Sequence, residues 1–168
     1  MKRAIIRTSD LVDAALLRVA IVALALLVGT VVLQVVARYV FFQPPVWTEE
    51  IARYLMIWAG LLGATLAFKR HFDPAIFQPK MGPRAQRLVL TIQSVAILIF
   101  VLPALFYCFV GPGLRVTRGF LIRHSKTYSE TLDIATIYVA VAVPLALAVI
   151  LLHLAARWAG ETKKPLKG

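Results

Sequence analysis

The sequence predicts an all-α membrane protein with four transmembrane helices and a short N-terminal interfacial helix, in a single domain of 168 residues. The chain is 60% hydrophobic and 16% charged, whereas soluble domains carry roughly 45–50% apolar and about 25% charged residues. Its apolar residues also gather in four long runs that few charges interrupt. A small globule cannot bury so much apolar surface, which excludes an ordinary water-soluble enzyme and a disordered chain.

The first apolar run, residues 19–37, is free of charge and lies between Arg18 and Arg38. Its length is about 28 Å as a helix, close to the roughly 30 Å hydrocarbon core of a bilayer. We therefore expect a span over residues 19–38. The preceding residues 8–18 begin with Thr8, Ser9 and Asp10, which are typical of helix starts. They predict a short interfacial helix continuous with the span.

The second apolar run, residues 54–68, is too short to cross a bilayer by itself. We therefore expect its helix to begin just after Pro44 and Pro45 and to span residues 48–68. Thr48 is a candidate N-cap. Glu49 and Glu50 would then lie in the first turn, where the helix dipole favours acidic groups.

The third and fourth spans are expected over residues 88–110 and 134–156. Thr127 and Glu130 have the spacing of a capping box before the fourth span. Between them, residues 111–133 form a long basic loop in which Arg115, Arg118 and Arg123 recur at helical spacing. We expect the third helix to continue beyond the bilayer after a bend. This extension would meet either lipid phosphates or an acidic surface of a partner.

The net charge of +11 is interpreted as membrane orientation and contact with lipid headgroups, not as nucleic-acid binding. With four spans, both termini and the middle loop share one side, which holds 13 of the 19 Lys and Arg residues. The other side holds six. This asymmetry places the N- and C-termini in the cytoplasm.

Residues that support chemistry are scarce. The sequence has no Gly-rich phosphate loop, H-E-x-x-H or C-x-x-C motif, so we expect no enzyme activity, metal or cofactor in this chain. No acidic residue lies in the middle of an expected span, where ion-coupled carriers place one. His153 is interpreted as a polar residue near an interface, and Cys108 as a packing residue. The chain is therefore expected to be a subunit without its own translocation path.

Two features of the second helix suggest a partner. Glu49 and Glu50 lie four and three residues before Arg53, within reach of its guanidinium. This cluster is either an interfacial ion-pair group, with Trp47 in the aromatic belt, or a docking site for another subunit. A stripe of small residues continues along the helix; it would pack against a partner helix or against this chain's own helices. Arg38, on the first helix, is expected to extend toward the lipid headgroups.

These residues resemble a known family, the small membrane subunit (DctQ type) of tripartite ATP-independent periplasmic (TRAP) transporters. The resemblance rests on residues 38–41 (Arg-Tyr-Val-Phe), then Trp47, Glu49, Glu50, Arg53 and Tyr54, then Trp58, Leu62, Gly63 and Ala64. Lys69, Arg70 and His71 match the family's basic loop, and residues 138–144 are similar to its closing segment. The chain departs from the family where Phe72, Asp73 and Pro74 follow the histidine.

The resemblance implies a transporter of the bacterial inner membrane that takes up an organic acid. A large multi-pass subunit would carry the sodium and substrate sites, and a periplasmic solute-binding protein would deliver the substrate. The small subunit would brace the large one and help dock the binding protein. The residues expected at its partner interface are Arg38, Trp47, Glu49, Glu50, Arg53, Tyr54, Trp58, Gly60, Gly63 and Ala64.

Two alternatives remain open from the sequence. A membrane anchor of a respiratory complex would hold haem or quinone for a soluble partner, and it would need paired histidines within the membrane. A small multidrug-type exporter would act alone, and it would need an acidic residue within a span. The sequence lacks both features.

Overall fold

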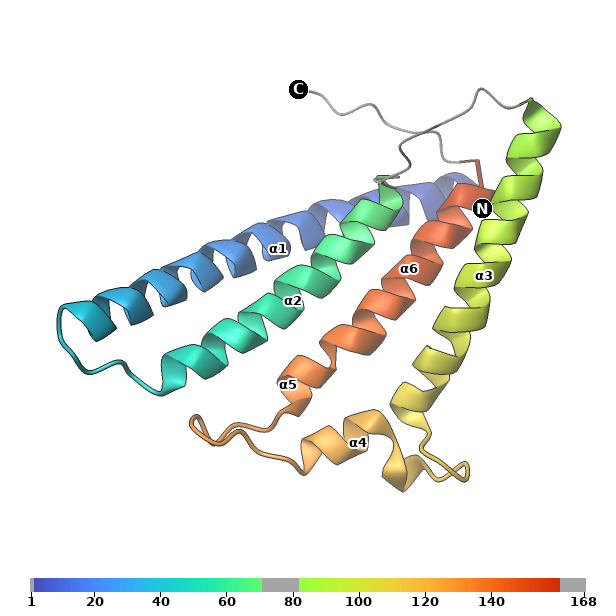
Figure 1. Ribbon diagram of the computed structural model, residues 1–168. Helices are drawn as coiled ribbons and strands as arrows, with labels where there is room; N and C mark the ends of the chain where they lie inside the picture. The colour runs from blue at the N-terminus through green and yellow to red at the C-terminus, as the bar shows by residue number, and fades with distance from the viewer. Residues whose placement is uncertain (1, 71–81, 161–168) are drawn as a thin grey trace.

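The computed structural model describes residues 2–70 and 82–160 and is built from helices (Figure 1). In chain order these are α1 (Lys2–Tyr39), α2 (Trp47–Lys69), α3 (Pro83–Phe109), the 3-10 helix η1 (Val116–Arg118), α4 (Phe120–Ser125), α5 (Ile137–Ala140) and α6 (Ala142–Trp158). Four stretches are long and apolar enough to cross a membrane, namely Lys2–Tyr39, Trp47–Lys69, Arg87–Phe109 and Ile137–Trp158. The predicted all-α fold with four spans is confirmed.

Helix α6 lies at the centre of the arrangement. It packs against α1, α2 and α3, while α1 and α2 form an antiparallel pair at one side. In Figure 1 the helices spread like a fan from the end at which α1 begins and α6 ends, with α3 at the opposite edge from α1. In the apolar part of the last span, Ile137–Trp158, 44% of the residues are buried, against 11–17% in the other three spans. The other three spans therefore contain few fully buried residues.

Helix α1 is a single continuous element of 38 residues, about 57 Å long and well beyond a hydrocarbon core. The predicted lead-in is continuous with the span, as expected. One face of this lead-in packs against other helices, because Ser9 is fully buried. At the far end of α1, Tyr39 is 71% exposed, and in the turn that leads to α2 Phe41 and Phe42 are 69% and 81% exposed.

The prediction that Thr48 is the N-cap of α2 is wrong by two residues. The helix begins at Trp47, and Val46 occupies the cap position without a side-chain hydrogen bond. Thr48 is fully buried inside the first turn. Its amide and its Oγ1 both donate to the Pro45 carbonyl, at 3.2 and 2.6 Å. The hydroxyl therefore fastens the proline turn to the helix instead of capping a free amide.

Helix α3 ends at Phe109 and does not continue as predicted. A tight loop follows, in which a Cβ atom on Gly111 would lie 2.2 Å from the Arg118 carbonyl oxygen. A Cβ on Gly119 would lie 2.3 Å from the Phe109 carbonyl oxygen. Because both positions need glycine, the chain can fold back on the end of α3 and restart as η1 and the short helix α4.

The predicted capping box of Thr127 and Glu130 is also wrong. Thr127 Oγ1 donates to the Arg123 carbonyl at 3.0 Å. The Ser129 amide donates to Ile134, and the Thr136 amide to Thr127, each at 2.9 Å, so the segment forms a small antiparallel turn. The last span therefore begins at Ile137 and not at residue 134. It is interrupted at Val141, shortly before Pro144, which has no amide hydrogen to continue the helix ladder.

Candidate functional site

The polar residues at the start of α2 line an open cleft of about 750 Å³. The cleft lies at what we call the loop end of the bundle, which holds the α1–α2 turn, α4 and α5, away from the start of α1 and the end of α6 (Figure 1). Its lining residues are Val46, Glu49, Glu50, Arg53, Tyr54, Ile57, Phe120, His124, Tyr128, Ser129, Glu130, Thr131, Thr136, Val139, Ala140 and Val143. We call it the loop-end cleft. The cleft lies between the predicted cluster of Glu49, Glu50 and Arg53 and the basic loop of residues 111–133.

Within the cleft, Glu50 fastens the loop to α2. Tyr54 donates its hydroxyl to Glu50 Oε1 at 2.6 Å. Thr131 donates both its amide, at 3.2 Å, and its hydroxyl to Glu50 Oε2. Both carboxylate oxygens are therefore engaged inside this chain. Of the predicted docking residues, Glu50 and Tyr54 shape the cleft instead of projecting from it.

Glu49 and Arg53 behave differently from Glu50. Arg53 Nη2 lies 3.2 Å from Glu49 Oε1, and the side chains remain 60% and 72% exposed. An exposed pair one helical turn apart contributes little to stability because water and salt screen it. These two groups stand at the mouth of the cleft and are accessible to another protein.

Of the other predicted interface residues, Trp58 bonds within the chain, whereas Trp47 and Arg38 are exposed. Trp58 donates its indole N–H to the Tyr138 carbonyl at 3.2 Å, so it links α2 to α5 within the chain. Trp47 is 39% exposed at the start of α2, as a residue of an aromatic belt would be. Arg38 is exposed at the end of α1.

The stripe of small residues on α2 borders an apolar groove of about 360 Å³. The groove is lined by Ala20, Ile21, Leu24 and Leu27 of α1 and by Met56, Ala59, Gly60 and Gly63 of α2, and we call it the α1–α2 groove. A Cβ atom on Gly60 or Gly63 would meet nothing within 4 Å, and Ala64 is exposed nearby. The described part of the chain therefore leaves these glycines uncovered.

A second polar cluster, not predicted from the sequence, lies at the opposite end of the bundle, where α1 begins and α6 ends, which we call the terminal end. Lys69 Nζ donates to Ser9 Oγ at 2.9 Å and to Asp10 Oδ1 at 3.0 Å. Arg70 Nη2 donates to Asp13 Oδ2 at 3.3 Å. Ser9 Oγ also lies 2.9 Å from Nδ1 of the buried His153. We call these residues and Arg157 the terminal-end cluster.

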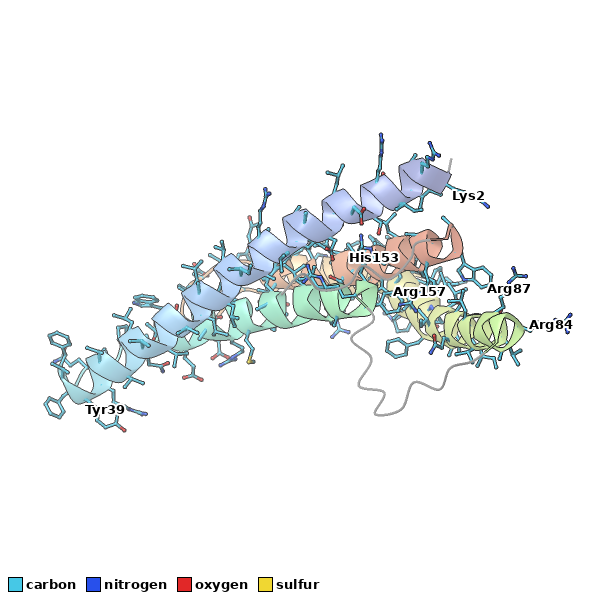
Figure 2. All side chains as sticks on the ribbon, turned by 90° about the horizontal axis from the view of Figure 1, so that it is seen from above. Lys2, Tyr39, Arg84, Arg87, His153 and Arg157 are labelled. Carbon is cyan, nitrogen blue, oxygen red and sulfur yellow. The ribbon has the colours of Figure 1, made fainter. Side chains whose placement is uncertain are left out.

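Arg157 extends this cluster toward α2. Its Nη2 donates to the Phe68 carbonyl at 3.0 Å, and its guanidinium lies 4.6 Å from the centroid of the Phe68 ring. The adjacent Trp158 donates its indole N–H to Ser94 Oγ at 2.9 Å, which joins α6 to α3. Figure 2 shows His153 and Arg157 on α6 at the same end as Lys2, far from Tyr39.

The positions of the charged residues in the sequence could have predicted this cluster. Asp10 and Asp13 precede the first apolar run, and Lys69 and Arg70 follow the second. In an antiparallel helical hairpin these two segments meet, so opposite charges there predict ion pairs. His153 is 2% exposed, so it is also a buried part of the packing between α1 and α6.

The histidines do not form a paired site in the described residues. His124 Nδ1 lies 2.9 Å from Thr136 Oγ1 beside the loop-end cleft, whereas His153 lies in the terminal-end cluster. Residues 2–70 and 82–160 contain no group of three or more His, Cys, Asp or Glu side chains that could hold a metal ion. His71 and the segment 72–74 that follows it lie outside the described residues.

Comparison with known proteins identifies the family. The model of the family described as tripartite ATP-independent periplasmic transporters, DctQ component, matches residues 27–164. A stretch of 78 residues is 41% identical to a TRAP transporter small permease protein of Haemophilus influenzae and covers 45% of this chain and 48% of that protein. Over 78 residues the chain is also 28% identical to the sialic acid TRAP transporter small permease protein SiaQ of Vibrio cholerae, with 45% of each chain covered.

A third relative is larger. Over 82 residues the chain is 33% identical to the sialic acid TRAP transporter permease protein SiaT of Haemophilus influenzae, covering 48% of this chain and 13% of that protein. The matched stretches thus span about half the length of the two small permeases and a minor part of SiaT. The matching family is a transporter component, which gives no support to a respiratory membrane anchor or to an enzyme. The chain belongs to the family of DctQ components, the small permease subunits of TRAP transporters.

Proposed function

We propose that this small permease scaffolds the large subunit of a sodium-coupled TRAP transporter and helps dock the periplasmic solute-binding protein during uptake of an organic acid. The observation that carries the proposal is the uncovered α1–α2 groove. Its glycines, Gly60 and Gly63, face open space in a segment of the protein that lies within the bilayer. An apolar helix of the large subunit would fill it.

The physical argument for this contact concerns helix association in lipid. Helices in a bilayer associate through close van der Waals packing, since lipid tails are as apolar as the side chains. Small residues permit that approach, and the groove presents Ala59, Gly60 and Gly63 along one helix. SiaT supports the partnership, because a stretch similar to this chain forms part of a much longer polypeptide named as a permease.

The distribution of acidic groups supports assigning transport to the large subunit. Glu49 and Glu50 lie at the loop end, and Asp10 and Asp13 lie in the terminal-end cluster, where Lys69 and Arg70 pair with them. A translocation path for cations needs an ionisable group partway across the membrane. We therefore place sodium and substrate sites in the partner and propose no cofactor for this chain.

The loop-end cleft is our proposed contact with the binding protein. Protein interfaces combine an apolar centre, filled by anchoring side chains, with a polar rim. Here Ile57, Phe120, Val139 and Val143 provide apolar lining, while Glu49, Arg53 and His124 provide polar groups. This assignment requires the loop end to be periplasmic, with both termini cytoplasmic, as the 13 to six distribution of Lys and Arg favours.

Co-purification tests the proposed function. The tagged chain is produced together with the large permease subunit of its own transport system and extracted in mild detergent. We expect the two proteins to be recovered in equal amounts, and uptake of an organic acid in proteoliposomes to require both of them and the binding protein. Recovery of this chain alone, monodisperse and competent for transport without the large subunit, would contradict the proposal.

A further inference from the structure

The terminal-end cluster contains two buried polar atoms that its ion pairs leave unmatched. His153 is 2% exposed, and its Nε2 has no hydrogen-bond partner among residues 2–70 and 82–160. Oδ1 of Asp13 is likewise buried and unpaired within these ranges. Buried polar groups are nearly always hydrogen-bonded, and those that are not destabilise the fold. Each of these two atoms therefore needs a hydrogen-bond partner that residues 2–70 and 82–160 do not provide.

The bonds around Ser9 indicate which ring nitrogen of His153 carries the proton. Lys69 Nζ, which can only donate, donates to Ser9 Oγ at 2.9 Å. The Ser9 hydroxyl keeps its own proton, and within the described part of the chain its one acceptor is His153 Nδ1, also at 2.9 Å. A ring that accepts at Nδ1 carries its proton on Nε2. The unmatched Nε2 is therefore a buried donor.

Asp13 provides the acceptor that this donor needs. It follows Ser9 by four residues on α1, so the two side chains lie on the same face of the helix, one turn apart. Its Oδ2 accepts from Arg70 at 3.3 Å, which leaves Oδ1 available. The charged groups that act electrostatically on the His153 ring are Lys69, Asp13, Arg157 and Asp10.

We propose that one buried water molecule joins His153 Nε2 to Asp13 Oδ1. The water accepts the Nε2 proton in a hydrogen bond and donates one of its own to the carboxylate. Buried waters typically occupy such positions, where they satisfy polar groups that the chain itself does not pair. The resulting hydrogen-bonded chain runs through Asp10, Lys69, Ser9, His153, the water, Asp13 and Arg70. It connects α1, α2 and α6 without any partner protein.

Nuclear magnetic resonance of the full chain in lipid nanodiscs tests this site. The protein contains three histidines, and His153→Gln identifies the signal of interest by its loss. With ¹⁵N-labelled histidine, we expect the His153 proton on Nε2, a hydrogen-bonded chemical shift, and a cross-peak between that proton and water. A proton on Nδ1 would overturn the proposal, as would a bond from Nε2 to the carboxylate without contact to water.

A pair of variants sharpens the measurement. Asp13→Ala removes the acceptor, and we expect loss of the water cross-peak and a shift of the Nε2 proton signal. Glu49→Ala removes an exposed carboxylate at the loop end and should leave both unchanged. An unaltered water cross-peak in Asp13→Ala would contradict the assignment. If Asp13→Ala does not fold, Asp13→Leu keeps the approximate size of the side chain, also removes the acceptor, and is measured for the same loss of the water cross-peak.

Discussion

The two ends of the helix bundle are held in different ways. At the terminal end, ion pairs and hydrogen bonds around Lys69 and His153 connect three helices, and the Lys69 side chain is only 7% exposed in its pair with Asp10. At the loop end, Arg53 and Glu49 form a pair that is more than half exposed, beside an open cleft. The helices spread from the first end toward the second (Figure 1). The comparison indicates that partly buried polar contacts join the helices at the terminal end, whereas at the loop end a tightly folded loop stands beside a polar cleft that is accessible to partners.

The largest change in stability is expected at Gly119, where the loop packs closely against the end of α3. Gly119→Ala places a Cβ against the Phe109 carbonyl, at 2.3 Å in the present backbone, so the chain cannot fold back on α3 without moving. We expect a loss of about 3 kcal/mol of unfolding free energy, typical of strong overpacking. Thermal unfolding in detergent measures it. Gly60→Ala is the matched control, because nothing lies within 4 Å of its Cβ. Equal stability of the two variants would contradict the account.

The next largest effect separates the two ends directly. Lys69→Met leaves Asp10 without this ammonium group, at a site where water screens the charge poorly. We expect destabilisation of about 2 kcal/mol, below the range for fully buried pairs because Asp10 is 33% exposed. Arg53→Met removes the corresponding cation from the exposed pair and should change stability little. If the two variants unfold at the same temperature, the ends do not differ as described.

A smaller, local effect is expected at Glu50. Glu50→Ala removes the acceptor of the Thr131 amide and hydroxyl, which frees the loop from α2. Amide hydrogen exchange should then become faster at Thr131, with the helices unchanged. Glu49→Ala is the control, since Glu49 bonds to Arg53 and not to the loop. Unchanged protection at Thr131 would show that other contacts hold the loop.

The smallest expected effect concerns docking. Arg53→Glu reverses an exposed charge at the mouth of the cleft, and it should weaken binding of the solute-binding protein severalfold without affecting insertion or folding. Surface plasmon resonance on the assembled permease measures this change. Reversal at Arg84, an exposed residue near the start of α3 at the terminal end, serves as the control. A comparable loss with Arg84→Glu would remove the loop-end cleft from consideration.

Much of the fold follows from local sequence, and the rest depends on contacts between distant residues. Run length and hydropathy were sufficient for four spans, because a bilayer selects helices of that length. The spacing of Thr127 and Glu130 wrongly predicts a capping box. The Thr136 amide donates to the Thr127 carbonyl, and this backbone bond replaces a helix start there. The bond between Glu50 and Thr131 joins residues 81 positions apart, which no local pattern reveals.

The candidate site was predicted in part for the same reason. The sequence placed Glu49, Glu50, Arg53 and Tyr54 together, but it could not show that Glu50 and Tyr54 bond within the chain while the other two stay exposed. The stripe of small residues left two interpretations open, and the structure leaves Gly60 and Gly63 uncovered. His153 was undervalued, because its burial depends on the packing of α1 against α6.

The most direct test of the central claim, that the α1–α2 groove receives a helix of the large subunit, is co-purification with Gly60→Leu. The leucine side chain would occupy the groove, whereas Gly60→Ala is a smaller change at the same position. We expect recovery of the large subunit to fall about tenfold with leucine and to remain near normal with alanine, while both variants insert and fold. Normal recovery with Gly60→Leu would contradict the account and place that face toward lipid.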